Sequence, residues 1–483
     1  MNYSMIFNIL GKVVTVEAAF LLPALVIALC CGENSAVLGF AVAMAVMLAL
    51  GLPLSLRKPK RTDIFAREGL ITVGLAWLSV SLLGALPFCI SGAIPNYIDC
   101  FFETASGFTT TGATILGEIE SLPRSILYWR SFTHWLGGMG VLVFLLILNP
   151  LAEKNSGENM HLLRAESPGI KISKLVPRMK TSAGILYLIY IALTILEFLA
   201  LWLGKNPVFD SVNIALSTAG TGGFAIKNDS LASYGAYTQW VVTVFMLLFS
   251  VNFNMYFLLL LGQFKKVVKN SELRTFLLLV IVSVGVLMFI TREYYASVEE
   301  NARTCAFQVL AVLSTTGFCT TDFDQWPQLA RSIMVMLLFC GACAGSTGGG
   351  AKIIRLQIFF KSVYRSIYKA FHPNAVRLIH MDGEVLDDET VNGVGTYFLL
   401  YFAMIALTTV LISVDGFSFE SNFTAAVTCM NNVGPGLGAV GAVMNYGGFS
   451  DFSKIILSLV MLIGRLEIYP MLVLFFPSAW KNN

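Results

Sequence analysis

The chain has 483 residues, of which 56% are hydrophobic and only 13% are charged, and its mean hydropathy is +0.74. Soluble proteins carry about a quarter charged residues, so this composition excludes an ordinary cytosolic globule and a disordered chain. The formal net charge of +3 is small and implies no nucleic-acid partner. The apolar runs are long and continuous rather than alternating with a period of two, which argues against a β-barrel. We therefore expect an all-α polytopic membrane protein.

Ten segments are predicted to span the membrane, since a helix needs about 20 mostly apolar residues to cross the hydrocarbon. They are residues 5–31, 36–56, 68–90, 125–149, 181–203, 237–261, 273–290, 329–343, 389–413 and 453–476. The eighth is interrupted by glycines and continues as a helix past Gly350. Four shorter apolar stretches lie between spans, at residues 97–108, 208–217, 300–313 and 419–430. Stretches of that length are too short to span and are typical of re-entrant helices.

The distribution of Lys and Arg predicts the orientation. The loops at 57–67, 154–180, 265–274 and 352–377 hold most of the basic residues, and they all fall on one side of the predicted spans. Basic loops mark the cytoplasm, so both termini are expected there. The opposite side carries Glu103, Glu118, Glu120, Asp210, Asp229, Glu299, Glu300, Asp322, Asp324, Glu420 and Asp451. Such a face raises the local cation concentration, although each acid can equally be a solvated loop charge.

A fourfold internal repeat organises the chain. Each short stretch runs into a related glycine segment, and the four segments are 109–113, 217–224, 314–318 and 431–436. Aligning Gly112, Gly222, Gly317 and Gly434 gives four units of span, short helix, glycine segment and span. The predicted divisions are 1–60 for two N-terminal transmembrane helices, 61–150 for the first repeat, 151–265 for the second, 266–380 for the third with its Gly-rich intramembrane loop, and 381–483 for the fourth.

The repeat has a direct physical interpretation. Non-helical backbone at membrane depth is tolerated only when it is buried in protein or lines a wet cavity. Four such segments can meet on a common axis, and glycine lets the chain turn its carbonyls inward because it accepts a positive φ. A ring of carbonyls replaces the hydration shell of a monovalent cation. The segments hold no carboxylate for a tight divalent site. Isolated glycine-rich turns would need no such explanation, but four at matching positions favour a pore.

Several motifs carry a family resemblance. They lie at 84–88 (GALPF), 107–114 (GFTTTGAT), 221–224 (TGGF), 431–438 (NNVGPGLG) and 464–467 (GRLE). At these residues the chain resembles the Trk/Ktr/HKT superfamily of potassium transporters, and the two extra N-terminal spans favour the membrane subunit of its Trk branch. The resemblance implies potassium uptake across a bacterial plasma (inner) membrane by a homodimer. It also implies control by a cytosolic nucleotide-binding subunit of the RCK type, similar to TrkA. No organic cofactor is expected in this chain, and the ion is the transported cargo.

The resemblance also implies a selectivity filter. The aligned glycines match the filter glycines of the family, and flanking residues would supply further carbonyls and hydroxyls. The predicted potassium ligands are Thr110, Thr111, Gly112, Thr221, Gly222, Thr315, Thr316, Gly317, Asn432, Val433 and Gly434. The second and fourth segments are not copies of the first, so the filter is expected to be asymmetric. The sequence leaves open how strongly sodium and rubidium are excluded.

The segment 341–350 (GACAGSTGGG) interrupts the eighth span and is predicted to be a gate, because glycines cannot hold a straight helix. The gate glycines are Gly345, Gly348, Gly349 and Gly350. Close helix packing through small residues is the alternative. Arg465 lies inside the last span, where a buried Arg is usually functional or paired. It is predicted to be a cationic barrier under the filter, with Glu467 or a loop carbonyl as its simpler partner. Arg130, beside His134 and Trp135, is interpreted as a structural anchor at the membrane interface.

Two other classes of function, a secondary transporter and an intramembrane enzyme, fit the sequence less well. A secondary transporter for an organic solute or sodium would normally show two inverted halves with charged groups at the midplane, whereas four like repeats argue against that arrangement. A sodium-coupled or sodium-conducting transporter of the same fold is the alternative that remains. An intramembrane enzyme would need a cluster of His, Asp or Cys at membrane depth, and none appears in the sequence. We therefore expect no enzyme activity.

Overall fold

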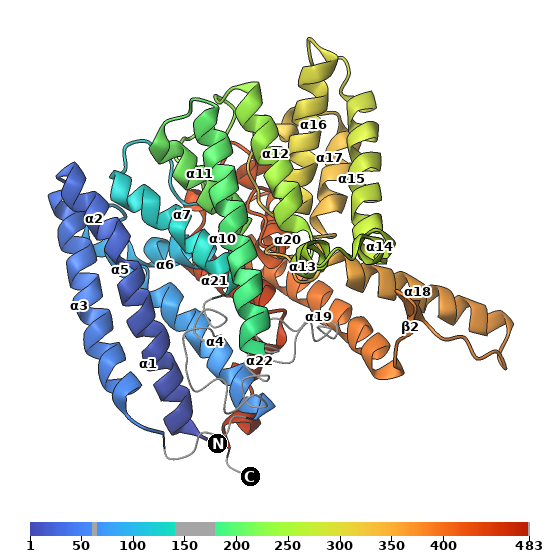
Figure 1. Cartoon of the computed structure of the whole chain (residues 1–483), viewed down its shortest axis with the longest axis horizontal. Helices are drawn as coiled ribbons and strands as arrows, with labels where there is room; N and C mark the ends of the chain where they lie inside the picture. Colours follow the sequence, from blue (N-terminus) through green and yellow to red (C-terminus); the bar gives the residue numbers. More distant parts are fainter. Residues whose placement is uncertain (60–64, 141–178, 482–483) are drawn as a thin grey trace.

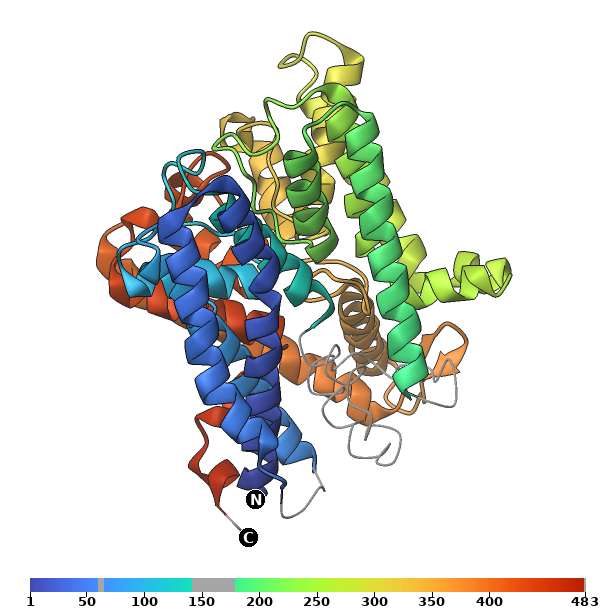
Figure 2. The same cartoon turned by 60° about the vertical axis from the view of Figure 1, so that its left-hand side comes forward.

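The computed structural model describes residues 1–59, 65–140 and 179–481, and it confirms the all-α architecture (Figure 1). Within this part of the chain, β-structure is limited to one antiparallel pair, β1 (His380–Met381) and β2 (Glu384–Val385). The end of the predicted span 125–149 and most of the basic loop 154–180 lie outside the described residues. The N-terminus and the last described residues lie at the same end of the molecule (Figures 1 and 2).

Three helices precede the repeats and lie along one side of the molecule (Figure 2). They are α1 (Tyr3–Phe20), α2 (Leu22–Cys31) and α3 (Asn34–Leu56). The first predicted span contains α1 and α2, and a proline in the first turn of α2 accompanies the break between them. Helices α1 and α3 approach closely through small residues, because a Cβ on Gly51 would lie 2.7 Å from the Thr15 hydroxyl. Close contact through small side chains is the usual packing of helices in membranes.

Each repeat begins with a long helix and continues with a short one. The long helices are α4 (Ala66–Leu83) with its extension α5 (Leu86–Ile90), α10 (Met179–Leu203), α15 (Ser271–Ile290) and α19 (Asp388–Ile412). The short helices are α6 (Tyr97–Phe108), α11 (Val208–Gly220), α16 (Val298–Leu313) and α20 (Phe419–Asn431). These bounds agree with the four short stretches predicted from the sequence. Asn96, Ser297 and Ser418 cap three of the short helices with their side chains.

The second helices of the repeats are shorter than predicted. They are α7 (Arg124–Met139), α12 (Ala236–Ser250), α17 (Gln328–Leu338) and α21 (Asp451–Arg465). The prediction of unbroken spans at 237–261 and 453–476 was wrong, since α12 turns by 89° into α13 (Phe253–Leu260) and α21 is followed by the separate α22 (Tyr469–Leu474). Among the described residues, six helices are long and apolar enough to span a membrane, or seven if the bent pair counts as one. Hydropathy alone did not reveal these breaks.

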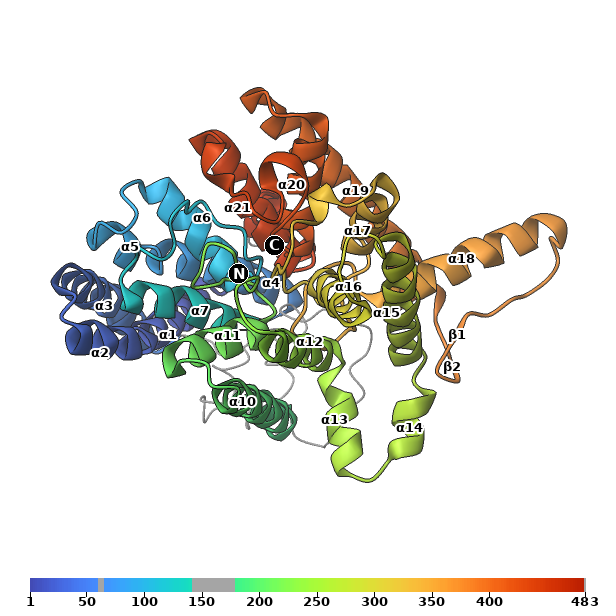
Figure 3. The ribbon, with the colours of Figure 1, turned by 90° about the horizontal axis from the view of Figure 1, so that it is seen from above.

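The remaining elements connect the repeats. Helix α14 (Phe264–Lys269) leads into the third repeat, and α18 (Ile353–Phe371) extends away from the other helices (Figures 1 and 3). Single turns of 3-10 helix occur at Phe323–Gln325, Ser413–Asp415, Gly438–Val440, Tyr446–Gly448 and Pro477–Trp480. Seen from above, the four short helices lie around the middle of the molecule, with α3, α10, α15 and α19 farther out (Figure 3). The glycine segments that follow the short helices are thereby brought to one place.

Candidate functional site

The four glycine segments form a closed ring. Neighbouring segments lie so close that a Cβ on each glycine would touch the backbone of the next segment. These contacts run from Gly112 to the Gly222 carbonyl, from Gly223 to the Thr316 carbonyl, from Gly317 to the Val433 carbonyl, and from Gly434 to the Thr111 carbonyl at 2.7 Å. Each segment therefore follows its predecessor in chain order and the fourth returns to the first. The segments encircle a common axis.

The same backbone turn occurs in all four segments. A residue in the left-handed region comes first, and the four are Thr110 (φ 57°), Thr221 (φ 54°), Thr315 (φ 61°) and Asn432 (φ 55°). Two residues later a glycine has a positive φ, and these are Gly112 (76°), Gly223 (78°), Gly317 (75°) and Gly434 (91°). A left-handed conformation costs a non-glycine residue about 1–2 kcal/mol, and it is rarer still for a β-branched one. Such strain persists when the surrounding structure over-determines it, and it clusters at functional sites.

The second segment is one residue out of the predicted register. Gly223, rather than the aligned Gly222, has the positive φ and follows the left-handed Thr221 by two positions. Gly112, Gly223 and Gly317 are also partly exposed, whereas Gly222 is buried. Gly222 and Gly223 are adjacent, and sequence alone does not show which of them corresponds to Gly112. Gly223 is therefore absent from the predicted ligands although the structure makes it the equivalent of Gly112.

The chemistry of the ring is neutral and oxygen-rich. The predicted side chains on it, among them Thr110, Thr111, Thr316 and Val433, are fully buried. The short helices end directly before the ring, so the negative ends of their dipoles point toward it. Among the described residues, no group of three or more His, Cys, Asp or Glu is placed to hold a metal ion. Backbone carbonyls in a ring suit a monovalent cation, because they replace its water without adding a fixed charge.

Three of the predicted gate glycines, Gly348, Gly349 and Gly350, lie directly against this ring, whereas Gly345 packs on the Asn252 side chain. Helix α17 ends at Leu338 and α18 begins at Ile353, so residues 341–350, which we call the glycine loop, are non-helical. The backbone N–H of Gly349 donates to the hydroxyl of Thr315 at 2.7 Å. A Cβ on Gly348 would lie 2.7 Å from the Ser314 carbonyl, and one on Gly349 the same distance from the Asn431 carbonyl. The loop therefore packs on the carboxyl ends of the third and fourth short helices.

Hydrogen bonds hold the glycine loop in this place. The Ser250 carbonyl, at the end of α12, accepts from the Cys343 N–H at 3.1 Å, and Gly345 accepts from the Phe253 N–H at 3.0 Å. These bonds use backbone groups left free where α12 bends into α13, which explains how the membrane tolerates that break. One carboxylate oxygen of Glu272 accepts from the N–H groups of Ala344 (2.7 Å) and Ile354 (3.2 Å). Glu272 thus ties the loop to the start of α18.

Arg465 joins the glycine loop to the first repeat. Its guanidinium donates to the carbonyl of Thr347 at 2.8 Å, and to those of Gly137 at 2.5 Å and Gly138 at 2.9 Å. Of the two simpler partners considered for Arg465, a loop carbonyl is therefore observed. Glu467 forms an ion pair with Arg355 at the start of α18. The last repeat is in this way linked both to the glycine loop and to the start of α18.

Comparison with known proteins gives the family. A family model described as TrkH, cation transport protein, matches residues 36–482. The chain belongs to this family. It is 36% identical over 452 residues to a Trk system potassium uptake protein TrkH of Salmonella typhimurium, covering 92% of this chain and 91% of the relative. The Escherichia coli K12 protein of the same name is 35% identical with the same coverage.

A solved structure shares the whole fold. The crystal structure of the potassium transporter TrkH from Vibrio parahaemolyticus superposes with a TM-score of 0.88 at 30% sequence identity, covering 100% of both chains. The resemblance to the Trk family is therefore confirmed, and with it a polytopic all-α membrane architecture. Membership of a family of cation transport proteins also fits a transporter rather than an enzyme.

A buried ion pair lies beside the ring. Glu103 on α6 and Arg130 on α7 are about 1% exposed, and their charged groups approach to 2.7 Å. Glu103 also accepts from the Ile115 N–H at 3.1 Å, and Arg130 donates to the Ala225 carbonyl at 3.2 Å. The expectation that Glu103 lies on an acidic outer face was wrong, because it faces Arg130 inside the protein. Arg130 is likewise buried, and its bond to Ala225 joins the first repeat to the residue that follows the second glycine segment.

Breaking this pair should destabilise the protein strongly. Arg130→Met leaves the Glu103 carboxylate buried without its cation, and we expect a loss of about 3–5 kcal/mol in folding stability. The double variant Glu103→Leu, Arg130→Met removes both charges and should recover much of that loss. Thermal unfolding of the purified protein in detergent measures both. An Arg130→Met protein as stable as the wild type would contradict the importance of this pair.

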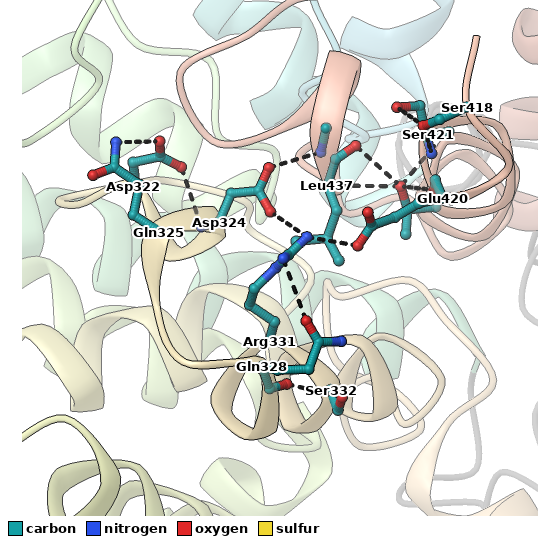
Figure 4. A network of polar contacts seen from close by, with 12 residues as sticks. Asp322, Asp324, Gln325, Gln328, Arg331, Ser332, Ser418, Glu420, Ser421 and Leu437 are labelled. Atoms are coloured by element: carbon teal, nitrogen blue, oxygen red, sulfur yellow. Dashed lines mark hydrogen bonds and ion pairs between the residues drawn. The ribbon is translucent and has the colours of Figure 1, made fainter.

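Polar contacts also cross each boundary between repeats. Besides Arg130 and the Ala225 carbonyl, they join Gln239 to Arg303, Arg331 to Glu420 at 2.6 Å, and Lys454 to Asp99 at 2.6 Å. Gln239, Arg331 and Lys454 are each the fourth residue of their helix. Figure 4 shows the third boundary, where Arg331 also contacts Asp324 at 2.8 Å and Asp324 accepts from the Gly438 N–H at 2.9 Å. These contacts join neighbouring repeats around the ring, and no sequence pattern pairs the residues that make them.

Proposed function

We propose that this protein takes up potassium across the bacterial plasma membrane through the ring of glycine segments. The observation that carries the proposal is the closed ring itself, in which four strained turns bring backbone oxygens around one axis. Carbonyl rings of this kind replace the hydration shell of an alkali ion. Relatives that align with more than nine-tenths of the chain are named potassium uptake proteins. Their names support potassium as the transported ion.

In this mechanism the ion enters from the side of the short-helix N-termini and exchanges water for carbonyl oxygens. The ligands we propose are the eleven residues predicted from the sequence, from Thr110 to Gly434, with Gly223 added as the equivalent of Gly112. Binding must be weak enough to release the ion again. Neutral carbonyls meet that requirement because they add no fixed negative charge to the ring.

We propose that the glycine loop and Arg465 close the path beneath the ring. The loop donates a hydrogen bond to Thr315 on the ring, and Arg465 bridges the loop to Gly137 and Gly138. A cation leaving the ring would meet both the loop backbone and a guanidinium charge. Opening then requires the bonds of Arg465 to Thr347 and to the first repeat to break together.

A cytosolic nucleotide-binding subunit of the RCK type is the regulator that we propose. Helix α18 follows the glycine loop directly and extends away from the other helices (Figure 3). Arg355 at its start is paired with Glu467, two residues after Arg465. A partner that moves α18 would therefore act on the loop and on Arg465. We further propose a homodimer in the lipid, the five sequence divisions given above, and both termini in the cytoplasm.

Ion flux tests the proposed function. Expression of the chain should restore growth of a potassium-uptake-deficient bacterium in low potassium. In liposomes, the purified protein should pass potassium and rubidium faster than sodium. A protein that passes sodium best, or that needs a sodium gradient to move potassium, would support the alternative of a sodium-conducting or sodium-coupled transporter. Absence of any alkali-ion flux both from the folded wild-type protein and from the Arg465→Ala variant, in which the proposed barrier is removed, would contradict both.

A further inference from the structure

The four glycine segments are not held in place by the same side chains. In the first segment the hydroxyls of Thr109 and Thr111 bond to each other at 2.8 Å. In the third, the hydroxyls of Ser314 and Thr316 do so at 2.6 Å. The corresponding positions are Gly220 and Gly222 in the second segment, and Asn431 and Val433 in the fourth. Two opposite segments therefore contain an internal hydroxyl pair, and the other two do not.

His134, from α7 of the first repeat, supports the second segment. A Cβ on Gly220 would collide with the His134 carbonyl, and one on Gly222 would collide with its imidazole ring. The ring is fully buried and packs against the Phe224 ring, with the centroids 4.2 Å apart and the planes tilted by 34°. Its Nδ1 lies 2.7 Å from the Gly107 carbonyl, and its Nε2 lies 3.2 Å from the Phe224 backbone N. The imidazole fills the space that side chains occupy in the first and third segments.

These two bonds define the state of the imidazole. A carbonyl only accepts, so Nδ1 carries the hydrogen that is donated to Gly107. A backbone N–H only donates, so Nε2 is unprotonated and accepts from Phe224. His134 is therefore a neutral ring that joins the first short helix to the backbone just after Gly223.

Tyr446 supports the fourth segment. Its hydroxyl donates to the Gly434 carbonyl at 2.8 Å and lies 2.9 Å from the Thr428 hydroxyl. Its own backbone N–H donates to the Thr114 carbonyl of the first repeat at 2.8 Å. The ring is 2% exposed and packs against Phe102 at 5.5 Å and Phe449 at 5.9 Å. One buried hydroxyl thus fixes the peptide plane of a ring glycine.

We propose that His134 and Tyr446 are positioning residues that set the spacing of the second and fourth glycine segments, and thereby the discrimination among alkali ions. The inference rests on the proposed function. It assigns to two aromatic rings the task that the hydroxyl pairs perform in the first and third segments. Neither residue needs to touch the ion, since each acts through the backbone of a glycine segment.

Tyr446→Phe is the sharpest test, because it removes one hydroxyl and leaves the ring in its aromatic contacts. Loss of one hydrogen bond to a ring carbonyl should lower the potassium-to-sodium flux ratio by about 2- to 10-fold. Tyr256→Phe is the matched control, since it loses a hydroxyl bond to the Leu248 carbonyl on α12 rather than to the ring. Its flux ratio should equal that of the wild type. An unchanged ratio in folded Tyr446→Phe overturns the role of Tyr446.

Two substitutions separate the two bonds of His134. His134→Gln can keep an acceptor for the Phe224 N–H, whereas His134→Asn can keep a donor for the Gly107 carbonyl. If the bond to Phe224 positions the second segment, the Gln variant will retain more of the potassium-to-sodium ratio than the Asn variant. Equal loss in two folded variants would reject that role. Size-exclusion profiles and thermal unfolding identify variants that fail to fold. If neither His134 variant folds, the proposal is tested by Tyr446→Phe.

The outcomes distinguish this inference from the function on which it rests. Failure of the wild-type protein to prefer potassium over sodium contradicts the proposed function. A wild-type protein that prefers potassium, together with Tyr446→Phe and His134 variants of unaltered preference, contradicts only the positioning roles.

Discussion

Replacing Gly317 with alanine is expected to abolish selective potassium flux. Gly317 has a φ of 75°, which costs an alanine about 1–2 kcal/mol. The added methyl group would also collide with the Val433 carbonyl and lie 2.9 Å from Pro435 Cδ. Since both neighbours belong to the next glycine segment, the ring can accept the methyl only by widening. Potassium, rubidium and sodium fluxes in liposomes measure the effect.

Gly416→Ala is the matched control for this variant. Gly416 has a φ of 73°, but a Cβ there meets no atom within 4 Å. The control therefore carries the same backbone strain without the contact. It should conduct as the wild type does. A Gly317→Ala protein with normal flux and selectivity would show that the ring is not the site where ions are discriminated.

Replacing Arg465 with alanine is expected to raise basal ion leak. The guanidinium donates to carbonyls of the glycine loop and of the first repeat, so its loss frees the loop and removes a positive charge beneath the ring. Charge-assisted hydrogen bonds contribute about 1.5–3 kcal/mol each, and 1.4 kcal/mol corresponds to a factor of ten, so we expect leak to rise by at least about tenfold. Flux through purified protein without any regulatory subunit measures it.

Arg465→Lys and Arg292→Ala complete this experiment. Lysine keeps the charge but lacks the planar guanidinium that donates to three carbonyls at once. The leak of Arg465→Lys should therefore lie between those of the wild type and Arg465→Ala. Arg292 is an exposed arginine beside Glu293, and its removal should leave leak unchanged. If a folded Arg465→Ala protein leaks no more than the wild type, Arg465 is not a barrier.

The sequence was most informative where the pattern was local. The short helices could be predicted because their apolar stretches are too short to span the membrane and each leads into a glycine segment. The glycine segments could be predicted because four similar runs followed those helices. The ring could then be predicted from the repeat, because similar units that cannot bury their apolar faces alone pack against one another in the same way.

Features that depend on contacts between repeats could not be predicted. Gly222 and Gly223 are chemically identical, and only the positive φ of Gly223 shows that it is the equivalent of Gly112. Glu103 looked like a loop charge because its partner Arg130 lies on another helix. The bend after Ser250 is stabilised by the distant glycine loop, so its cause is absent from the local sequence. His134 and Tyr446 carried no motif, because their roles arise from carbonyls brought to them by the fold.

The ring has a consequence for how such a pore changes over time. In a tetramer of identical subunits, one altered codon changes all four quadrants together, so ion preference moves in large steps. Here each quadrant is encoded separately, and the first and third already differ from the second and fourth in how they are braced. A single mutation therefore changes the side chains of one quarter of the aperture and leaves those of the other three quarters as they were. This arrangement allows ion preference to be adjusted gradually.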